Sequence, residues 1–297
     1  MKAAVVQSFD APPAYADFAE PTPGPGEELV TVRAAGLHLL VKAIAAGKHY
    51  SSDAPPPFIA GVDGVAHTAS GRRVYFGRLK HPYGTMAERA AASGLAFELP
   101  AALSDAKCAA VMNPGMSSWL ALVERAKLEK GETVLVIGAT GASGALAVQV
   151  AKKLGAGRVL AAGRDREALE KLPADEVLLL DDLAKVGTRE IGVVLDYIWG
   201  PPAEVTLNAL RGRSRYVQIG SLAGDDVRVP ARVLRSTGLT LMGSGIGSVP
   251  MAAFAREIPR FLEIAAGLDL EAVEVPLRDV AKVWNERTGT KRIVLVP

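Results

Sequence analysis

Short apolar runs separated by Pro and Gly fill the first hundred residues. The breaks include residues 12–13, 21–26 and 55–57. The runs between the breaks lie at residues 3–7, 29–35, 62–69, 73–76 and 85–91. Short runs of this kind between turn signals predict strands. We therefore expect a partly open β-barrel or sandwich, with one short helix at residues 39–46.

A different pattern begins near residue 101. Ser104 and Asp105 can cap a helix that we expect to reach residue 127, with a break at Pro114 and Gly115. Apolar runs typical of buried parallel strands then alternate with segments of helical spacing. The predicted strands are 134–137, 158–162, 176–180, 192–197, 216–220 and 239–243, and the predicted helices are 145–154, 166–172, 203–210 and 229–235. This alternation predicts an α/β fold with a doubly wound parallel sheet.

The end of the chain returns to the first pattern. A long helix is predicted at residues 252–266, followed by β-like segments at 273–275 and 291–296. The simplest organisation is a discontinuous β-rich domain made of residues 1–100 and 270–297. A Rossmann domain then occupies residues 101–269.

Composition and charge narrow the function classes. Of 297 residues, 49% are hydrophobic and 22% charged, and the formal net charge is only +2 with mixed signs. This balance favours neither nucleic acid nor a membrane surface as a partner. No apolar run is long enough to span a membrane, and the first residues do not read as a signal peptide, so we expect a cytoplasmic protein. Cys108 is the only cysteine, which excludes an intrachain disulfide and a Cys-rich zinc lobe.

A Gly-rich loop at residues 138–144 follows the predicted strand 134–137 and opens a helix. Ala139, Gly141 and Gly144 match a G/A-x-G-x-x-G fingerprint in that context. Small residues let a pyrophosphate approach the backbone, and the helix N-terminus offers free N–H groups and a positive dipole end. We predict that the cofactor contacts Ala139, Thr140, Gly141, Ala142, Ser143 and Gly144. The alternative is a Gly-rich turn without a ligand.

The end of the second Rossmann strand indicates which dinucleotide binds. Gly163 lies twenty-two residues after Gly141, where an NAD site usually has an acidic residue for the ribose 2′-OH. Arg164 follows and can bind a 2′-phosphate, whereas Asp165 is better placed to cap the next helix. We therefore predict NADPH, with Gly163 and Arg164 in its site. The alternative makes Arg164 a solvated loop charge.

Five stretches carry a resemblance that covers nearly the whole chain. They are residues 134–155, 194–200 and 216–223, together with the early segments 34–47 and 61–63. Through them the chain resembles the medium-chain dehydrogenase/reductase superfamily, in its zinc-free, quinone oxidoreductase-like branch. The resemblance implies a GroES-like catalytic domain beside the Rossmann domain, NADPH bound in a cleft, and a homodimer. It also implies hydride transfer to quinones, enones or related activated carbonyl compounds.

The same resemblance bears on metals and on further site residues. The positions that hold catalytic zinc in the alcohol dehydrogenase branch correspond to His38, Val62 and Asn113, so we expect no metal. Segments that lie near the nicotinamide in that family correspond to Ser117, to Gly220 and Ser221, and to Ser244 and Gly245. Relatives often have Asn in the segment matching His38, and tyrosines matching Ala43 and His49.

Three side chains are candidates for catalysis. His38 can donate a hydrogen bond to a substrate carbonyl, and His49 or Tyr50 can protonate an enolate. The alternatives are a packed His38 and surface roles for the other two. We expect Asp196 to tie down the loop that follows it.

The predicted function is hydride transfer from NADPH to a quinone or α,β-unsaturated carbonyl compound without zinc. Alternatives are reduction of an enoyl thioester or ketone, and a low-turnover NADPH-binding sensor or scaffold.

Overall fold

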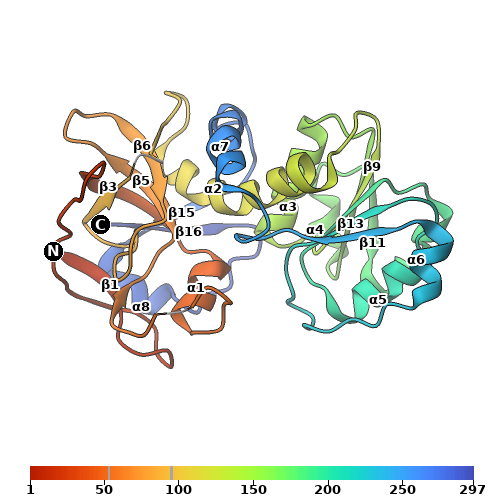
Figure 1. Cartoon of the computed structure of the whole chain (residues 1–297), viewed down its shortest axis with the longest axis horizontal. Helices are drawn as coiled ribbons and strands as arrows, with labels where there is room; N and C mark the ends of the chain where they lie inside the picture. The colour runs from red at the N-terminus through yellow and green to blue at the C-terminus, as the bar shows by residue number, and fades with distance from the viewer. Residues whose placement is uncertain (53, 94–95) are drawn as a thin grey trace. The chain divides into compact units, whose positions relative to one another are not determined.

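The computed structural model describes residues 1–52, 54–93 and 96–297, which divide into two compact units (Figure 1). The first unit combines Met1–Asn113 with Ile258–Pro297, and the second unit is Pro114–Glu257. Two helices, α2 (Asp105–Leu120) and α7 (Met251–Ala265), contain the boundaries. A change in sequence pattern cannot locate a boundary within a continuous helix, and the boundaries predicted at residues 100 and 270 stay predictions.

A parallel sheet forms the centre of the second unit. Its six strands lie in the order β11-β10-β9-β12-β13-β14. They are β9 (Thr133–Ile137), β10 (Arg158–Gly163), β11 (Glu176–Leu179), β12 (Val193–Asp196), β13 (Arg215–Gln218) and β14 (Thr240–Gly243). The strand order reverses beside β9, as in a doubly wound sheet, so the predicted Rossmann-type sheet is confirmed.

Helices cover both faces of this sheet. They are α3 (Ala142–Lys153), α4 (Arg166–Glu170), α5 (Gly200–Ala209) and α6 (Ala231–Thr237), with a 3-10 segment η2 (Leu180–Thr188). Right-handed crossovers put α3 and α5 on opposite faces, and Figure 1 shows them on opposite sides of the strands. Leu135 and Ile137 pack in one core cluster with Leu207 of α5. Both faces of β9 are covered, which is why its apolar residues do not alternate with polar ones.

The predicted break at Pro114 is wrong. Helix α2 runs through this proline and continues into a π-helical segment, η1 (Ala121–Ala126). Proline removes one backbone donor, but Met112, Met116 and Trp119 are all buried around it. Packing of the helix on both sides of Pro114 therefore outweighs the loss of one hydrogen bond.

Two sheets build the first unit. One has the order β2-β1-β4, and the other has the order β15-β16-β3-β5-β6-β8, with β7 also paired to β3. The strands are β1 (Lys2–Val6), β2 (Ala14–Asp17), β3 (Glu28–Gly36), β4 (Phe58–Ile59), β5 (Asp63–His67), β6 (Arg73–Gly77), β7 (Arg89–Ala92), β8 (Phe97–Glu98), β15 (Ala272–Pro276) and β16 (Arg292–Val296). The remaining short elements are α1 (Leu39–Ala45), η3 (Leu277–Asp279) and α8 (Val280–Val283).

The two ends of the chain meet within this unit. The C-terminal strand β16 pairs antiparallel with β3, through Val294 opposite Gly36 and Leu295 opposite Ala35. This pairing puts the last strand of the chain in one sheet with strands from the first hundred residues. Within the described residues, no helix is both long and apolar enough to cross a membrane.

Candidate active site

The loop at residues 138–144 joins the carboxyl end of β9 to α3. Two backbone amides, those of Gly138 and Ala139, donate to the carbonyl of Ala162 on β10, each at 2.9 Å. Gly138 has φ +86°, a left-handed conformation that favours glycine. A Cβ added to Gly144 would lie 2.2 Å from the carbonyl oxygen of Gly138. The turn and the first helical turn are therefore packed backbone against backbone.

This loop has the features that a pyrophosphate requires. Gly141 is the N-cap of α3, and no side chain caps the helix. The amides of the first helical turn have no partner within a helix, and they carry the positive end of its dipole. Gly141 is exposed, and a Cβ placed there would meet nothing nearer than 3.7 Å. The residues present thus fit a dinucleotide, with small side chains where the backbone must be approached closely.

The end of β10 lies beside this loop. Gly163 is buried, and a Cβ added to it would lie 2.9 Å from Cγ2 of Thr140. The next residue, Arg164, is exposed. Asp165 caps α4, because its side chain accepts a hydrogen bond from the amide of Ala168 at 3.1 Å. The expected cap is confirmed. Arg164 is the exposed cation directly after Gly163.

Two further predicted loops lie at the same edge of the sheet. Gly220 follows β13, and its amide donates to the carbonyl of Asp196 at 3.2 Å. Ser244 follows β14, and its amide donates to the carbonyl of Gln218 at 2.8 Å. All six strands are parallel, so the segments after β9, β10, β12, β13 and β14 emerge at one edge. The structure therefore brings most of the sequence-predicted cofactor residues to that edge, with Ser221 and Gly245 next to these two.

A buried tyrosine follows β12. Asp196 accepts hydrogen bonds from the amides of Ile198 and Trp199 at 2.8 and 3.0 Å, and from the Tyr216 hydroxyl at 2.6 Å. Asp196 thus holds the loop, as expected from the sequence. Burial raises the pKa of Tyr197 to about 12, although the nearby hydroxyls of Ser117 and Ser118 act in the opposite direction.

Both serine hydroxyls are committed within α2. Ser117 donates to the carbonyl of Pro114 at 2.7 Å, and Ser118 donates to the carbonyl of Gly115 at 2.8 Å. The buried hydroxyl of Tyr197 has no hydrogen bond of normal geometry in the described chain, although each serine oxygen keeps lone pairs that can accept one. Sequence reasoning did not identify this tyrosine, since nothing in its local pattern indicates burial of its hydroxyl.

A second polar cluster lies inside the first unit and centres on His38. The His38 residue is only 2% exposed. Its Nε2 lies 3.4 Å from Oδ1 of Asp63, and neither ring nitrogen has a hydrogen bond of normal geometry. Tyr75 donates to the other carboxylate oxygen of Asp63 at 2.9 Å. In this arrangement His38 is a packed histidine, and its nitrogens are not accessible.

The surroundings of His38 favour its neutral form. Burial lowers its pKa most strongly, the carboxylate of Asp63 opposes this, and the guanidinium of Arg292 lowers it further. Arg292 is buried on β16 and donates to the carbonyl of Leu37 at 3.2 Å. The cation that the structure brings to His38 is Arg292, from the last strand of the chain. No sequence signal links two positions so far apart.

The other two catalytic candidates lie on the turn after α1. The rings of His49 and Tyr50 have centroids 4.0 Å apart, and Nδ1 of His49 lies 2.6 Å from the Ser51 hydroxyl. Partial burial lowers the pKa of His49. Tyr50 is 69% exposed. The structure therefore places these two rings together, with Tyr50 reaching solvent.

Metal binding has no visible basis among the described residues. No group of three or more His, Cys, Asp or Glu side chains suited to a metal ion occurs among them. Burial raises the pKa of Cys108 well above its ordinary value, helped by the carboxylates of Asp63 and Asp105. A thiol with a raised pKa is a poor nucleophile and a poor ligand in its neutral form.

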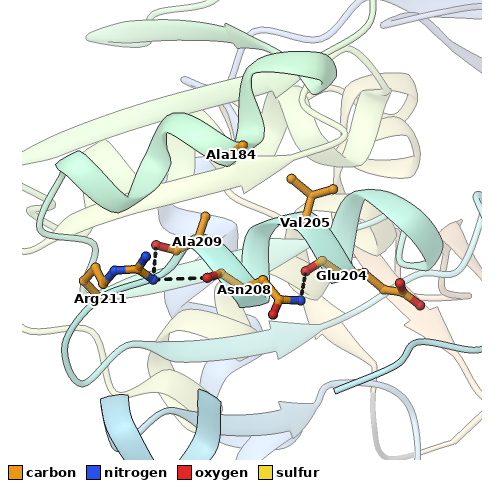
Figure 2. Close-up of a pocket in the computed structure, with 6 residues that line it drawn as sticks. All are labelled: Ala184, Glu204, Val205, Asn208, Ala209 and Arg211. Carbon is orange, nitrogen blue, oxygen red and sulfur yellow. Dashed lines mark hydrogen bonds between the residues drawn. The ribbon is translucent and has the colours of Figure 1, made fainter. Parts of the chain in front are cut away.

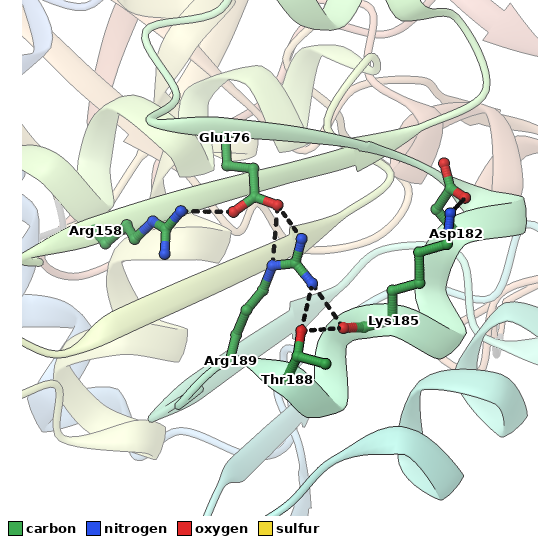
Figure 3. A network of polar contacts seen from close by, with 6 residues as sticks. All are labelled: Arg158, Glu176, Asp182, Lys185, Thr188 and Arg189. Carbon is green, nitrogen blue, oxygen red and sulfur yellow. Dashed lines mark hydrogen bonds and ion pairs between the residues drawn. The ribbon is translucent and has the colours of Figure 1, made fainter.

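Two other polar features of the second unit lie away from the loop edge. A hollow of about 440 Å³ between η2 and α5 contains Arg211, whose guanidinium caps the last carbonyls of α5 (Figure 2). Glu176 binds Arg158 and Arg189 in an ion network (Figure 3). Arg158 and Glu176 begin β10 and β11, so this network lies at the amino edge of the sheet. Neither feature is part of the candidate site.

Comparisons with known proteins agree with this geometry. The chain matches no protein-family model. It is 29% identical to a probable NADPH-dependent quinone reductase of Emericella nidulans, in an alignment that covers all of both chains. It also resembles the crystal structure of the quinone oxidoreductase from Thermus thermophilus, solved with and without NADPH, with 29% identity, full coverage of both chains and a TM-score of 0.85.

A third similarity involves much larger proteins. The chain is 29% identical to part of a mycocerosic acid synthase-like polyketide synthase from Mycolicibacterium smegmatis. The match covers 68% of this chain and 10% of that synthase. Similarity to one section of a multi-domain synthase bears on the choice among possible hydride acceptors.

Proposed function

The chain belongs to the medium-chain dehydrogenase/reductase superfamily, and we propose that it transfers hydride from NADPH to a quinone or an α,β-unsaturated carbonyl compound. It is an NADPH-dependent oxidoreductase in its general class. The observation that carries the proposal is the loop 138–144, which lies beside Gly163 and Arg164 at the carboxyl edge of the parallel sheet.

Each part of this edge has a binding role. The amides of Ala142, Ser143 and Gly144 would bind the pyrophosphate at the N-terminus of α3. Arg164 would bind the 2′-phosphate, and its exposed position leaves the guanidinium free to take a bidentate geometry. Bound NADPH supplies a hydride from C4 of its nicotinamide ring. Ser117, Ser221 and the Ser244–Gly245 segment are the proposed neighbours of that ring.

The first unit contains the proposed proton donors. Tyr50 and His49 lie on an accessible turn, whereas His38 is buried and neutral. Three conservative variants separate the candidates: Tyr50→Phe, His49→Gln and His38→Gln. Loss of the true donor lowers kcat and kcat/KM together. If water delivers the proton, all three variants stay within about threefold of the wild type, far below the usual 10²–10⁴-fold effect of a general acid.

A substrate panel tests the proposed acceptor. Purified protein is mixed with NADPH and either quinones, simple enones, enoyl thioesters or ketones, and oxidation of the cofactor is followed by absorbance. Fastest turnover with quinones or enones supports the proposal. Preference for enoyl thioesters supports the alternative that the polyketide synthase similarity favours. Tight NADPH binding without turnover on any acceptor supports a sensor or scaffold.

We also propose that the reaction needs no zinc. The three positions that correspond to zinc ligands are His38, Val62 and Asn113, and the His38 ring is packed against Gly36 and Asp63. A lone imidazole provides one ligand, whereas a catalytic zinc site needs three from the protein.

A homodimer is proposed through the edge strand β14. One edge of β14 pairs with no other strand in the described part of the chain. Leu241 on this strand and Leu234 on α6 are 39% and 41% exposed. An open edge with exposed leucines invites pairing with a second chain. Sedimentation analysis should find a dimer, and Leu241→Glu should shift it toward the monomer.

A further inference from the structure

The absence of a side chain at residue 163 has a packing cause as well as an electrostatic one. A Cβ built on Gly163 would lie 2.9 Å from Cγ2 and 3.2 Å from Oγ1 of Thr140, and 3.3 Å from Cδ2 of Leu169. Real Cβ atoms essentially never approach another heavy atom within 3.0 Å. Any residue other than glycine at position 163 therefore displaces a neighbour.

Thr140 is the neighbour that would have to move. Leu169 is fully buried on α4. The backbone around Thr140 is held on both sides, since Gly138 and Ala139 donate to Ala162, and Gly141 donates to the carbonyl of Gly138 at 3.2 Å. Thr140 can then yield only by rotating about χ1. Cγ2 and Oγ1 of Thr140 both lie close to position 163. Only the rotamer that turns the hydrogen on Cβ of Thr140 toward position 163 removes the conflict.

The contact between Thr140 and position 163 lies in the part of the site that would bind the ribose 2′ group, where NADH and NADPH differ. In dinucleotide-binding folds the acidic residue that binds the ribose hydroxyls stands at the end of the second strand, and β10 ends at Gly163. A β-branched side chain is stiff at χ1, so an aspartate entering at position 163 would meet a resisting neighbour. Thr140 thus keeps the space of that carboxylate filled, independently of the charge of Arg164.

We propose that Thr140 is a second determinant of cofactor selectivity, which sterically excludes an acidic side chain at residue 163. The inference rests on the proposed use of NADPH and adds a specificity-determining residue to that site. It implies that charge changes at residues 163 and 164 alone do not change the cofactor preference from NADPH to NADH. That change also requires a smaller side chain at position 140.

A stability cycle without cofactor tests the packing. Gly163→Ala is made in the wild type and in Thr140→Ala and Thr140→Val backgrounds, and the Tm of each protein is measured. We expect Gly163→Ala to lower the Tm in the wild type and in Thr140→Val, which keeps the branched volume, but much less in Thr140→Ala. An equal loss in all three backgrounds would overturn the inference.

A binding series tests selectivity. Gly163→Asp is combined with each residue at position 140, and the Kd for NADH and for NADPH is obtained by fluorescence titration. We expect Gly163→Asp alone to weaken NADPH binding without strengthening NADH binding. Adding Thr140→Ala to Gly163→Asp should strengthen NADH binding by about tenfold. Thr140→Val should give no such gain.

The failures of the two proposals differ. A wild-type protein that binds NADH as tightly as NADPH refutes the proposed cofactor preference, and this inference with it. A wild type that prefers NADPH, but gains full NADH affinity from Gly163→Asp alone, refutes only the role of Thr140.

Discussion

Two glycines of the phosphate loop should respond to the same substitution in different ways. An added Cβ at Gly144 would lie 2.2 Å from the Gly138 carbonyl oxygen and 2.7 Å from Cα of Ala139, and both of these neighbours are backbone. An added Cβ at Gly141 would lie 3.7 Å from its nearest neighbour, and its φ of −87° suits any residue. Gly144→Ala therefore tests packing, whereas Gly141→Ala tests access of a ligand to the backbone.

The magnitudes follow from these distances. To bring the Gly144 contact to 3.0 Å, the turn and the helix must separate by about 0.8 Å, against the hydrogen bonds that hold Gly138 and Ala139 to β10. Overpacking of this kind typically costs about 1–3 kcal/mol, which lowers the Tm of a domain of this size by about 2–10 °C. Gly141→Ala should change stability by less than about 0.5 kcal/mol.

Cofactor binding should fall in both variants. In Gly141→Ala the methyl group occupies the space through which the backbone approaches the pyrophosphate, and a loss of about tenfold or more in NADPH affinity is expected. Thermal unfolding by circular dichroism without cofactor and fluorescence titration with NADPH measure the two effects separately. The reasoning is refuted if Gly141→Ala destabilises the protein as much as Gly144→Ala does, or if it binds NADPH as tightly as the wild type.

Three further outcomes are expected. Arg164→Ala should weaken NADPH binding about tenfold or more and leave NADH binding nearly unchanged, because a charged hydrogen bond contributes roughly 1.5–3 kcal/mol. The preference for NADPH should then no longer depend on salt concentration. An unchanged ratio of the two Kd values would mean that Arg164 does not contact the phosphate. Since the pKa of His38 is lowered below its ordinary 6.5, the unfolded state binds the proton more readily, and stability to urea should fall as the pH drops from about 7.5 to about 5.5. His38→Gln should make the stability to urea depend less on pH. If the pH dependence is the same as in the wild type, it arises from other groups. Elemental analysis should find well under one zinc per chain, and chelators should leave the rate unchanged; stoichiometric zinc lost together with activity would contradict zinc independence.

Local patterns determined much of the second unit. The apolar run that became β9 needs burial on both faces, and only a sheet covered by helices provides it. Helix caps were readable in both units, since Ser104 in the first unit accepts from the amide of Lys107 at 3.2 Å and Asp165 in the second accepts from the amide of Ala168. The loop 138–144 was identified for the same reason, because its glycines, its strand and its helix are neighbours in sequence.

Features that depend on distant partners were decided only by the tertiary structure. Helix α2 continues through Pro114 because packing around it outweighs a local break signal. The environment of His38 is set by Asp63 on β5 and by Arg292 on β16, which reaches the carbonyl of Leu37 across 255 positions of sequence. Position 163 could be read from the sequence as a missing charge, but not as a space filled by Thr140. Hydrophobic periodicity and capping act over a few residues, whereas burial, pKa and steric exclusion depend on which distant side chains the fold brings together.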